Sequence, residues 1–438
     1  MKFLRKSIPV LLAAALLIGL AVPVMASPAS RNATLEVLYR NIQIMLNGET
    51  LIPRDEQGRI VEPFIYQGTT FLPVRAVADA LGIDVDWDDA SATVLLEQPQ
   101  RQDVAVWIPR NQLPFTPTPP DLRPIEEMEP VPSGLAGFQP STELPETGRV
   151  VRLVDRPNVY LPDVWEFYVQ YDSENPDIYF HFIAPRQPNP AEPVDWPLII
   201  YSPGAAWGRQ NLYVRFNWAI RLVERGFAVA VVRYRDTALP QRDAFPAPVE
   251  DLRTAVRYLR QNAEHFSVDT DRFVMWGDSS GGHISAMAAI TGDGMFDNGR
   301  LNQYSSDVAA LITWYPPSYL PAGAFYPSLL DRLGPETSSG LIIGGVPLLE
   351  NLDLAREAST TTYIPDAENI PPTLIITGNN DIILPYNQSV RFYEALRQYG
   401  HTAEFVMVLN GNHGFEGAGF FSDAIFDIME DFIREHVD

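Results

Sequence analysis

Six short apolar segments along residues 149–438 constrain the fold of this chain more than any other feature. They are Leu198–Ile200, Ala228–Val232, Phe273–Trp276, Ala309–Trp314, Leu374–Ile376 and Phe405–Leu409. Their apolar residues are consecutive and do not alternate with polar ones, as expected of strands buried on both faces. Helical patterns lie between them, most clearly at Val249–Leu259, where apolar residues recur every three or four positions. Alternating strands and helices predict an α/β domain with a mostly parallel sheet and helices on both faces.

Three further apolar stretches precede this alternation, at Val150–Val154, Phe167–Tyr171 and Ile178–Ile183. We interpret them as antiparallel strands at the edge of the sheet. Residues 149–438 are therefore expected to form one large domain.

Residues 1–26 have the features of a secretory signal peptide. Three basic residues precede an apolar run over Ile8–Met25, and Val24-Met25-Ala26 is a small-x-small cleavage pattern. The run is also about as long as a short membrane-spanning helix, so an uncleaved anchor is the alternative. Both interpretations place the rest of the chain outside the cytoplasm, either secreted or associated with the cell envelope.

The composition excludes several classes of function. The chain has 32 basic and 55 acidic residues, a net charge of −23. Such a surface repels phosphate backbones and anionic lipid headgroups, which argues against nucleic-acid partners and against adhesion to a membrane surface. The chain contains no cysteine. Disulfides, zinc–thiolate sites, iron–sulfur clusters and a lipidated cysteine are therefore excluded.

Residues 30–97 have the pattern of a small α+β module. Asn47-Gly48 is a hairpin turn signal, because both residues tolerate positive φ. Apolar strand-like residues occur at Leu35–Leu46 and Thr93–Leu96, and a helix is expected through Val77–Leu81, ending at Gly82. The pattern resembles the copper-amine-oxidase N-terminal-like stalk domain of secreted bacterial proteins. Residues 30–97 contain no histidine or cysteine to bind copper, so we interpret them as a spacer or interaction module, or as a domain that only helps folding.

Residues 98–148 are predicted to form a proline-rich linker. Eleven prolines fall between Pro99 and Pro145. Proline fixes φ and removes an amide donor, so neither helix nor sheet propagates and an extended, semi-rigid spacer is expected. The alternative is that part of the segment lies along the next domain, because Trp107, Phe115 and Phe138 favour burial.

The sequence Gly277-Asp278-Ser279-Ser280-Gly281 directly follows the predicted strand Phe273–Trp276 and precedes a helical pattern. Gly-x-Ser-x-Gly in a strand–turn–helix context is typical of a nucleophile elbow, where a tight turn exposes the serine Oγ. Small flanking residues are needed because larger side chains would clash. The pattern predicts Ser279 as the nucleophile; an ordinary turn is the alternative.

A hydroxyl needs a base to take its proton, and the base must be oriented by an acid. His413 follows the strand Phe405–Leu409, and Asp381 follows the strand Leu374–Ile376. Loops at the carboxyl ends of parallel strands carry the active site in this architecture. Ser279, Asp381 and His413 occur in the order that is typical of α/β-hydrolases. His283, four residues after Ser279, is assigned a packing role.

The oxyanion of an acyl-transfer reaction needs backbone amide donors. We expect one from Ser280 and others from Ala205 and Ala206, in the loop that follows the strand Leu198–Ile200. A simple Pro-Gly turn is the alternative for this loop. Each step requires only proton transfer and amide hydrogen bonds, so neither a cofactor nor a metal ion is expected.

Residues 197–438 resemble the secreted esterase/lipase branch of the α/β-hydrolases, with hormone-sensitive-lipase-like and feruloyl-esterase-like members. The matching segments are Ser202–Trp207, Val232–Arg235, Phe245–Asp251, Asp269–Arg272, Gly277–His283, Gly378–Pro385 and Gly411–Phe415. Where the family usually has His-Gly-Gly-Gly-Trp, this chain has Pro203-Gly204-Ala205-Ala206-Trp207. The two added methyl groups are expected to narrow the acyl side of the site and to disfavour bulky acyl groups.

The resemblance implies a secreted serine carboxylesterase that acts through an acyl-enzyme on small or glycan-attached esters. The order of signal, stalk, proline-rich spacer and enzyme predicts that the stalk domain contacts the cell envelope and positions the hydrolase away from its surface. A serine peptidase of the prolyl-oligopeptidase type is the alternative, since such peptidases share the fold and the triad. They often carry a β-propeller, for which this chain has no room. A non-catalytic binding protein is a third hypothesis, but a binding scaffold does not need three catalytic residue types.

Overall fold

A computed structural model describes residues 37–437 with interruptions. The stretches outside the description are 41, 47–48, 52, 55–58, 67–68, 73, 75–83, 89–92, 98–104, 131–133, 135–137, 154–163, 173–174, 176, 187–193, 238–242, 415–419 and 421, besides residues 1–36 and 438. The chain divides into two compact units, Met1–Gln102 and Asp103–Asp438. The predicted signal peptide and the predicted helix through Val77–Leu81 lie outside the described residues.

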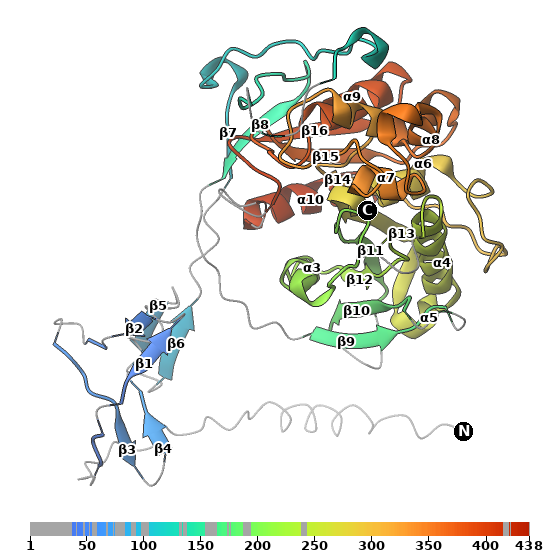
Figure 1. The fold of residues 1–438 in the computed structure, drawn as a ribbon. Coiled ribbons are helices and arrows are strands. Elements are labelled where there is room, and N and C mark those ends of the chain that lie inside the picture. The colour runs from blue at the N-terminus through green and yellow to red at the C-terminus, as the bar shows by residue number, and fades with distance from the viewer. Residues whose placement is uncertain are drawn as a thin grey trace, which may run out of the picture. The chain divides into compact units, whose positions relative to one another are not determined.

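The smaller unit contains three antiparallel strand pairs, β1–β2, β3–β4 and β5–β6 (Figure 1). Their bounds are Ile44–Leu46, Glu49–Leu51, Phe64–Tyr66, Thr69–Phe71, Asp84–Asp88 and Thr93–Glu97. The rings of Phe64 and Phe71 stack with centroids 5.3 Å apart across β3 and β4. The strand expected at Thr93–Leu96 is present as β6, which pairs with β5.

The larger unit is built on a ten-stranded sheet with the order β7-β8-β16-β15-β14-β13-β11-β12-β10-β9. The bounds are Ala105–Trp107 (β7), Arg149–Leu153 (β8), Val164–Val169 (β9), Phe180–Pro185 (β10), Trp196–Ser202 (β11), Ala228–Val232 (β12), Val268–Asp278 (β13), Ala310–Trp314 (β14), Thr373–Gly378 (β15) and Ala403–Val408 (β16). Strands β11 to β16 run parallel, and they contain the six apolar segments predicted from the sequence.

The direction and place of β8 differ from the prediction. Strands β9 and β10 are antiparallel edge strands as expected, but β8 lies at the opposite end of the sheet and runs parallel to β16. An apolar stretch predicts burial and carries no information about strand direction. In the structure β8 lies between β16, to which it is parallel, and β7, to which it is antiparallel.

Helices cover both faces of this sheet (Figure 1). Their bounds are Phe216–Val223 (α3), Ala247–Gln261 (α4), Ala263–Phe266 (α5), Ser279–Thr291 (α6), Ser338–Ile342 (α7), Leu352–Glu357 (α8), Asn387–Gln398 (α9) and Asp423–His436 (α10). Helices α3 and α10 pack on one face, whereas α4, α6 and α9 pack on the other. No helix in the described part of the chain is both long and apolar enough to span a bilayer.

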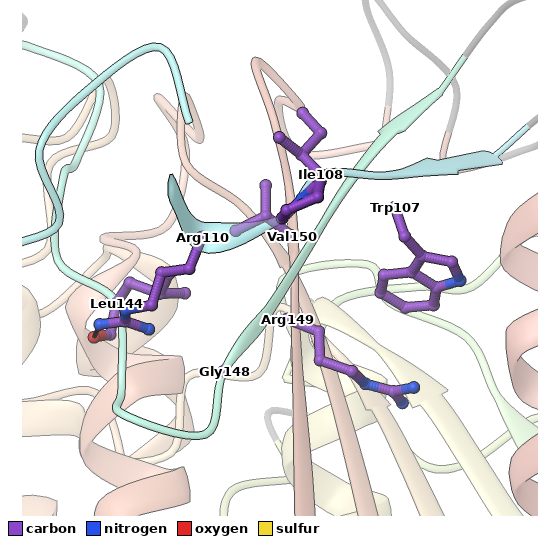
Figure 2. Close-up of a pocket in the computed structure, with 8 residues that line it drawn as sticks. Trp107, Ile108, Arg110, Leu144, Gly148, Arg149 and Val150 are labelled. Carbon is purple, nitrogen blue, oxygen red and sulfur yellow. Dashed lines mark hydrogen bonds between the residues drawn. The ribbon is translucent and has the colours of Figure 1, made fainter. Parts of the chain in front are cut away.

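Most of the predicted linker, from Asp103 onward, belongs to the larger unit. This corrects the spacer interpretation and agrees with the alternative that part of the segment lies along the next domain. Strand β7 pairs with β8, and the side chains of Ile125 and Leu144 are only 3% and 2% exposed in the hydrophobic core. Figure 2 shows Arg110 beside Leu144, where its guanidinium donates to the carbonyl of Leu144 at 3.2 Å. We call residues 108–148 the strap. The described strap includes short 3-10 helices at Arg110–Gln112 and Ile125–Glu127. Its carbonyls accept hydrogen bonds from α9, and its apolar side chains pack in the core.

A hollow of about 350 Å³ lies between the start of the strap and β8 (Figure 2). The guanidinium of Arg149 stacks 4.6 Å from the ring centroid of Trp107 on one side of it. The hollow is lined by β7, β8 and the strap, and none of the three predicted catalytic residues lines it.

Candidate active site

Ser279 lies at the turn between β13 and α6, as the first residue of the helix. Its φ is +53°, a left-handed conformation that is unusual for a residue other than glycine. The turn approaches β11 so closely that a Cβ at Gly281 would overlap the carbonyl of Ser202. The small residues of the predicted elbow are therefore required by contact with a neighbouring strand.

The structure brings the three predicted catalytic side chains into one chain of hydrogen bonds. Ser279 Oγ lies 2.9 Å from His413 Nε2, and His413 Nδ1 lies 2.7 Å from Asp381 Oδ2. The side chains of Asp381 and His413 are 1% and 3% exposed. In the tautomer that fits both contacts, Nδ1–H donates to the carboxylate and Nε2 accepts from the serine hydroxyl. This arrangement can remove a proton from Ser279 and hold it on the imidazole.

Asp381 is held in place by its own loop. Its Oδ1 accepts hydrogen bonds from the amides of Ile383 at 2.9 Å and Leu384 at 2.8 Å. The other oxygen thus remains directed at His413. The ring of Tyr315 also packs against the imidazole, with its centroid 4.4 Å from that of His413. The carboxylate and the aromatic ring together fix the plane of the imidazole.

Asp278, next to the nucleophile, forms a buried network that the sequence did not reveal. Its Oδ1 accepts from the hydroxyl of Tyr201 at 2.7 Å and from the amide of Gly204 at 2.9 Å, and Arg215 lies 3.7 Å from Oδ2. Burial raises the pKa of the Tyr201 phenol well above its usual range, and the negative charge of Asp278 adds to this effect. The hydroxyl therefore stays protonated and remains a donor. This network ties the loop after β11 to the elbow.

The predicted oxyanion residues lie beside the elbow, with one amide already engaged. The amide of Ala205 donates to Ser280 Oγ at 3.0 Å. The amide of Ala206 makes no hydrogen bond to any described group, and the amide of Ser280 is among the first of α6, which have no partner within the helix. Ala206 and Ser280 therefore retain free donors near Ser279, whereas the Ala205 amide would first have to leave Ser280 Oγ.

The packing role predicted for His283 agrees with its contacts. His283 Nδ1 accepts from the indole N–H of Trp207 at 3.0 Å, and Nε2 donates to the carbonyl of Ala358 at 2.8 Å. Burial lowers its pKa to about 4, so the ring is neutral in the folded protein near pH 7. His283 thus fixes the end of the loop that carries Ala205 and Ala206. His181, which is also buried, lies in the edge strand β10 and packs among the rings of Tyr168, Tyr179, Tyr213 and Phe216.

One cluster of described side chains has the donor types of a metal site, formed by Glu404, Glu435 and His436. Their potential ligand atoms lie within 4.8 Å of one another, but Glu404 also pairs with Arg149. The cluster lies at the start of β16, whereas His413 follows the end of that strand. It is therefore separate from the chain of hydrogen bonds at Ser279.

Comparison with known proteins gives two matches to protein families. Residues 187–396 match the BD-FAE family, and residues 40–112 match the copper amine oxidase N-terminal domain. The second match continues beyond the predicted boundary at residue 97 and ends in the first residues of the strap.

Individual relatives and solved structures also match this chain. Esterase LipC of Mycobacterium tuberculosis is 27% identical over 240 residues, which cover 53% of this chain and 55% of that protein. The acylamino-acid-releasing enzyme of Rattus norvegicus is 24% identical, covering 59% and 34%. The solved structure of a truncated carbohydrate esterase from gut microbiota has a TM-score of 0.54 and 26% identity, covering 63% of this chain and 96% of that one. The chain spans about half the length of the curated relatives it matches first.

Proposed function

Because the chain carries a BD-FAE esterase domain with an α/β-hydrolase fold, preceded by a copper amine oxidase N-terminal-like domain, we propose that it is a serine carboxylesterase. The observation that carries this proposal is the chain of hydrogen bonds from Ser279 Oγ through His413 to Asp381, with distances of 2.9 and 2.7 Å. The esterase names of the relatives support the same reaction class.

The reaction proceeds in two halves. Ser279 Oγ attacks the ester carbonyl carbon while His413 Nε2 takes the hydroxyl proton, and Asp381 stabilises the imidazolium through Nδ1–H. The negative oxygen that forms is stabilised by the amides of Ala206 and Ser280, joined by Ala205 once its bond to Ser280 Oγ is released. The alcohol leaves with the proton from His413. In the second half, water attacks the acyl-enzyme while His413 takes its proton. Ser279 Oγ then leaves with that proton, and the acid is released.

The substrate is a short-chain ester, in free form or attached to a glycan. The similarity to a solved carbohydrate esterase supports the glycan class. The methyl groups of Ala205 and Ala206, where the family usually has glycine, favour small acyl groups. An aminoacyl substrate is the second candidate, because the acylamino-acid-releasing enzyme is also a relative.

The enzyme acts outside the cytoplasm, with the smaller unit in contact with the cell envelope. The basic residues, apolar run and cleavage pattern of residues 1–26 support secretion. Fractionation of cells that produce the full chain tests this: enzyme found in the medium or envelope agrees with the proposal, and enzyme confined to the cytoplasm contradicts it.

Paired assays on p-nitrophenyl acetate and an aminoacyl p-nitroanilide test the activity. Hydrolysis of the acetate with little cleavage of the anilide is the expected result. Preferential cleavage of the anilide would show that the protein is a peptidase and not an esterase. A protein that hydrolyses neither substrate would refute the proposal. A series of acyl chain lengths and acetylated or feruloylated glycans would then identify the ester.

A further inference from the structure

The strap is bonded directly to the loop that carries Asp381. The amide of Ser141 donates to the carbonyl of Asn379 at 2.8 Å, and Asn379 Nδ2 donates back to the carbonyl of Ser141 at 3.2 Å. Asn379 precedes Asp381 by two residues, and its side chain is 3% exposed. A segment that the sequence predicts to be a spacer therefore contacts the catalytic loop through two reciprocal hydrogen bonds.

The same asparagine also reaches the loop that carries His413. Asn379 Oδ1 accepts from the amide of Asn410 at 2.6 Å, and Asn410 has a left-handed φ of +59° three residues before His413. Both ends of one buried amide side chain are thus occupied, Nδ2 by the strap and Oδ1 by the histidine loop. Any shift of Asn379 is transmitted to both loops.

A second connection from the strap reaches the other end of the loop that carries Asp381. The amide of Gly134 in the strap donates to the carbonyl of Ser328 at 2.8 Å. Ser328 Oγ in turn donates to the carbonyl of Ile383 at 2.7 Å. The amide of Ile383 is one of the two that hold Asp381 Oδ1. The strap therefore supports the loop on both sides of Asp381.

We propose that Asn379 is a positioning residue for the Asp381–His413 pair, and that the strap acts on catalysis through its bonds to Asn379. The proposal rests on the proposed esterase function. Its physical basis is that reacting groups must be aligned closely, since a misplacement of about 1 Å costs up to about a hundredfold in rate. The described hydrogen bonds of Asn379 join it to Ser141, Asn410 and Val408 and not to Ser279, so its effect must pass through the two loops.

Two variants interrupt the contact from opposite sides. Asn379→Ala removes the side-chain bonds to the Ser141 carbonyl and the Asn410 amide, but it keeps the backbone carbonyl that accepts from Ser141. Ser141→Pro removes the amide that donates to this carbonyl, together with the Oγ that accepts from the amide of Glu143. Gln139→Pro is the matched control, because it introduces proline into the same strap at a residue whose amide bonds to no described group. We expect kcat on p-nitrophenyl acetate to fall about tenfold or more in the first two variants, with KM within about twofold of wild type. The control should stay within about twofold in both constants.

The reaction of Ser279 with a fluorophosphonate provides an independent readout. Its rate should fall by a factor similar to kcat, since it also depends on proton removal by His413. Activities are expressed per labelled serine, so misfolded molecules do not contribute. A lower melting temperature with unchanged kcat per labelled site would show a purely structural role and overturn the proposal.

A double-mutant cycle decides whether the effect of Ser141→Pro on kcat passes through the side chain of Asn379. If it does, Ser141→Pro should cause little further loss once that side chain is gone, and the double variant should lose about as much kcat as Asn379→Ala alone. Losses that multiply would overturn the link to the strap. If Ser141→Pro does not fold, Asn379→Ala decides alone: kcat within twofold of wild type refutes the positioning role. A wild-type chain inert toward ester and fluorophosphonate would instead refute the proposed function, on which this inference depends.

Discussion

At the scale of single residues, the geometry at Ser279 depends on a strained backbone and on neighbours that are distant in sequence. A φ of +53° at a serine costs of the order of 1 kcal/mol or more, and it persists because the contact with β11 leaves no alternative. The strain exposes Oγ to His413. A role for Ser279 in catalysis accounts for this conformation, whereas an ordinary turn would accept a glycine there.

Ser279→Ala is expected to lower kcat for ester hydrolysis by a factor on the order of 10⁵ or more, because the nucleophile is lost. The fold should be retained, since alanine has no larger side chain than serine. Steady-state assays and thermal melting check both statements. Ser305→Ala, in the loop after α6, is the control and should keep its activity. Wild-type turnover in the Ser279→Ala variant would remove the residue from the proposed mechanism.

His283 should make the folded state less stable in acid. Its pKa is about 4 in the folded protein and 6.5 in the unfolded chain, so between these values only the unfolded chain binds the proton. The contribution of His283 to the free energy of unfolding is complete above pH 6.5. It is lost as the pH falls toward 4, by about 3 kcal/mol in all. Urea unfolding of wild type and His283→Gln from pH 7.5 to 4.5 measures this.

The difference in unfolding free energy between wild type and His283→Gln should shrink as the pH falls. The exposed residue His265 provides the control, since His265→Gln should follow the wild-type pH dependence. A constant difference between wild type and His283→Gln across this range would contradict the assignment of a neutral, buried imidazole.

At the scale of secondary structure, the sheet was predictable because burial on both faces leaves a clear signal. The six apolar segments lie in the parallel strands β11 to β16, and Val249–Leu259 lies within α4. The positions of Ser279, Asp381 and His413 followed from the strands that precede them. The Asp278 network could not be predicted in this way, because Tyr201 and Arg215 come from β11 and the start of α3, and nothing in the spacing pairs them with Asp278.

A larger side chain should not be tolerated where the start of α6 passes close to the end of β11. A methyl group at Gly281 would meet the backbone carbonyl of Ser202 and the carbonyl carbon of Pro203, neither of which can rotate away. Gly281→Ala is therefore expected to destabilise the fold by about 3 kcal/mol or more. Gly334→Ala is the control, since its Cβ would make an ordinary contact of 3.6 Å with Thr337. Chemical denaturation measures both, and similar stabilities would refute the close approach.

At the scale of the whole molecule, the boundary between the two compact units lies between Gln102 and Asp103, before the strap and not after it. The proline content predicted a spacer over 98–148, because local sequence shows what a segment cannot form by itself. Local sequence does not show that the edge of the sheet and the surface of α9 are available for the segment to pack against. Arg391 of α9 donates to the carbonyls of Asp121 and Arg123, and the hydroxyl of Tyr386 donates to the carbonyl of Glu143. These partners lie more than 200 residues away along the chain.

Truncation separates the two interpretations. The spacer interpretation predicts that a chain beginning at Gly148 folds and keeps its kcat. The structure predicts the opposite, because this chain lacks β7 and the buried side chains of Ile125 and Leu144. Those two side chains alone contribute roughly 3–6 kcal/mol, a large part of the 5–15 kcal/mol typical of a domain.

A chain beginning at Asp103 retains the strap and should unfold cooperatively, with a kcat on p-nitrophenyl acetate close to that of the full-length protein. The chain beginning at Gly148 should be recovered poorly, or have a much lower melting temperature and a lower kcat per fluorophosphonate-labelled serine. Limited proteolysis of the full chain should accordingly cut before β7 and spare the described strap, whose backbone is bonded to the sheet and to α9. Equal stability and kcat in both truncated chains would return the strap to the role of a spacer, and would also leave Asn379 without the support from Ser141 on which its positioning role depends.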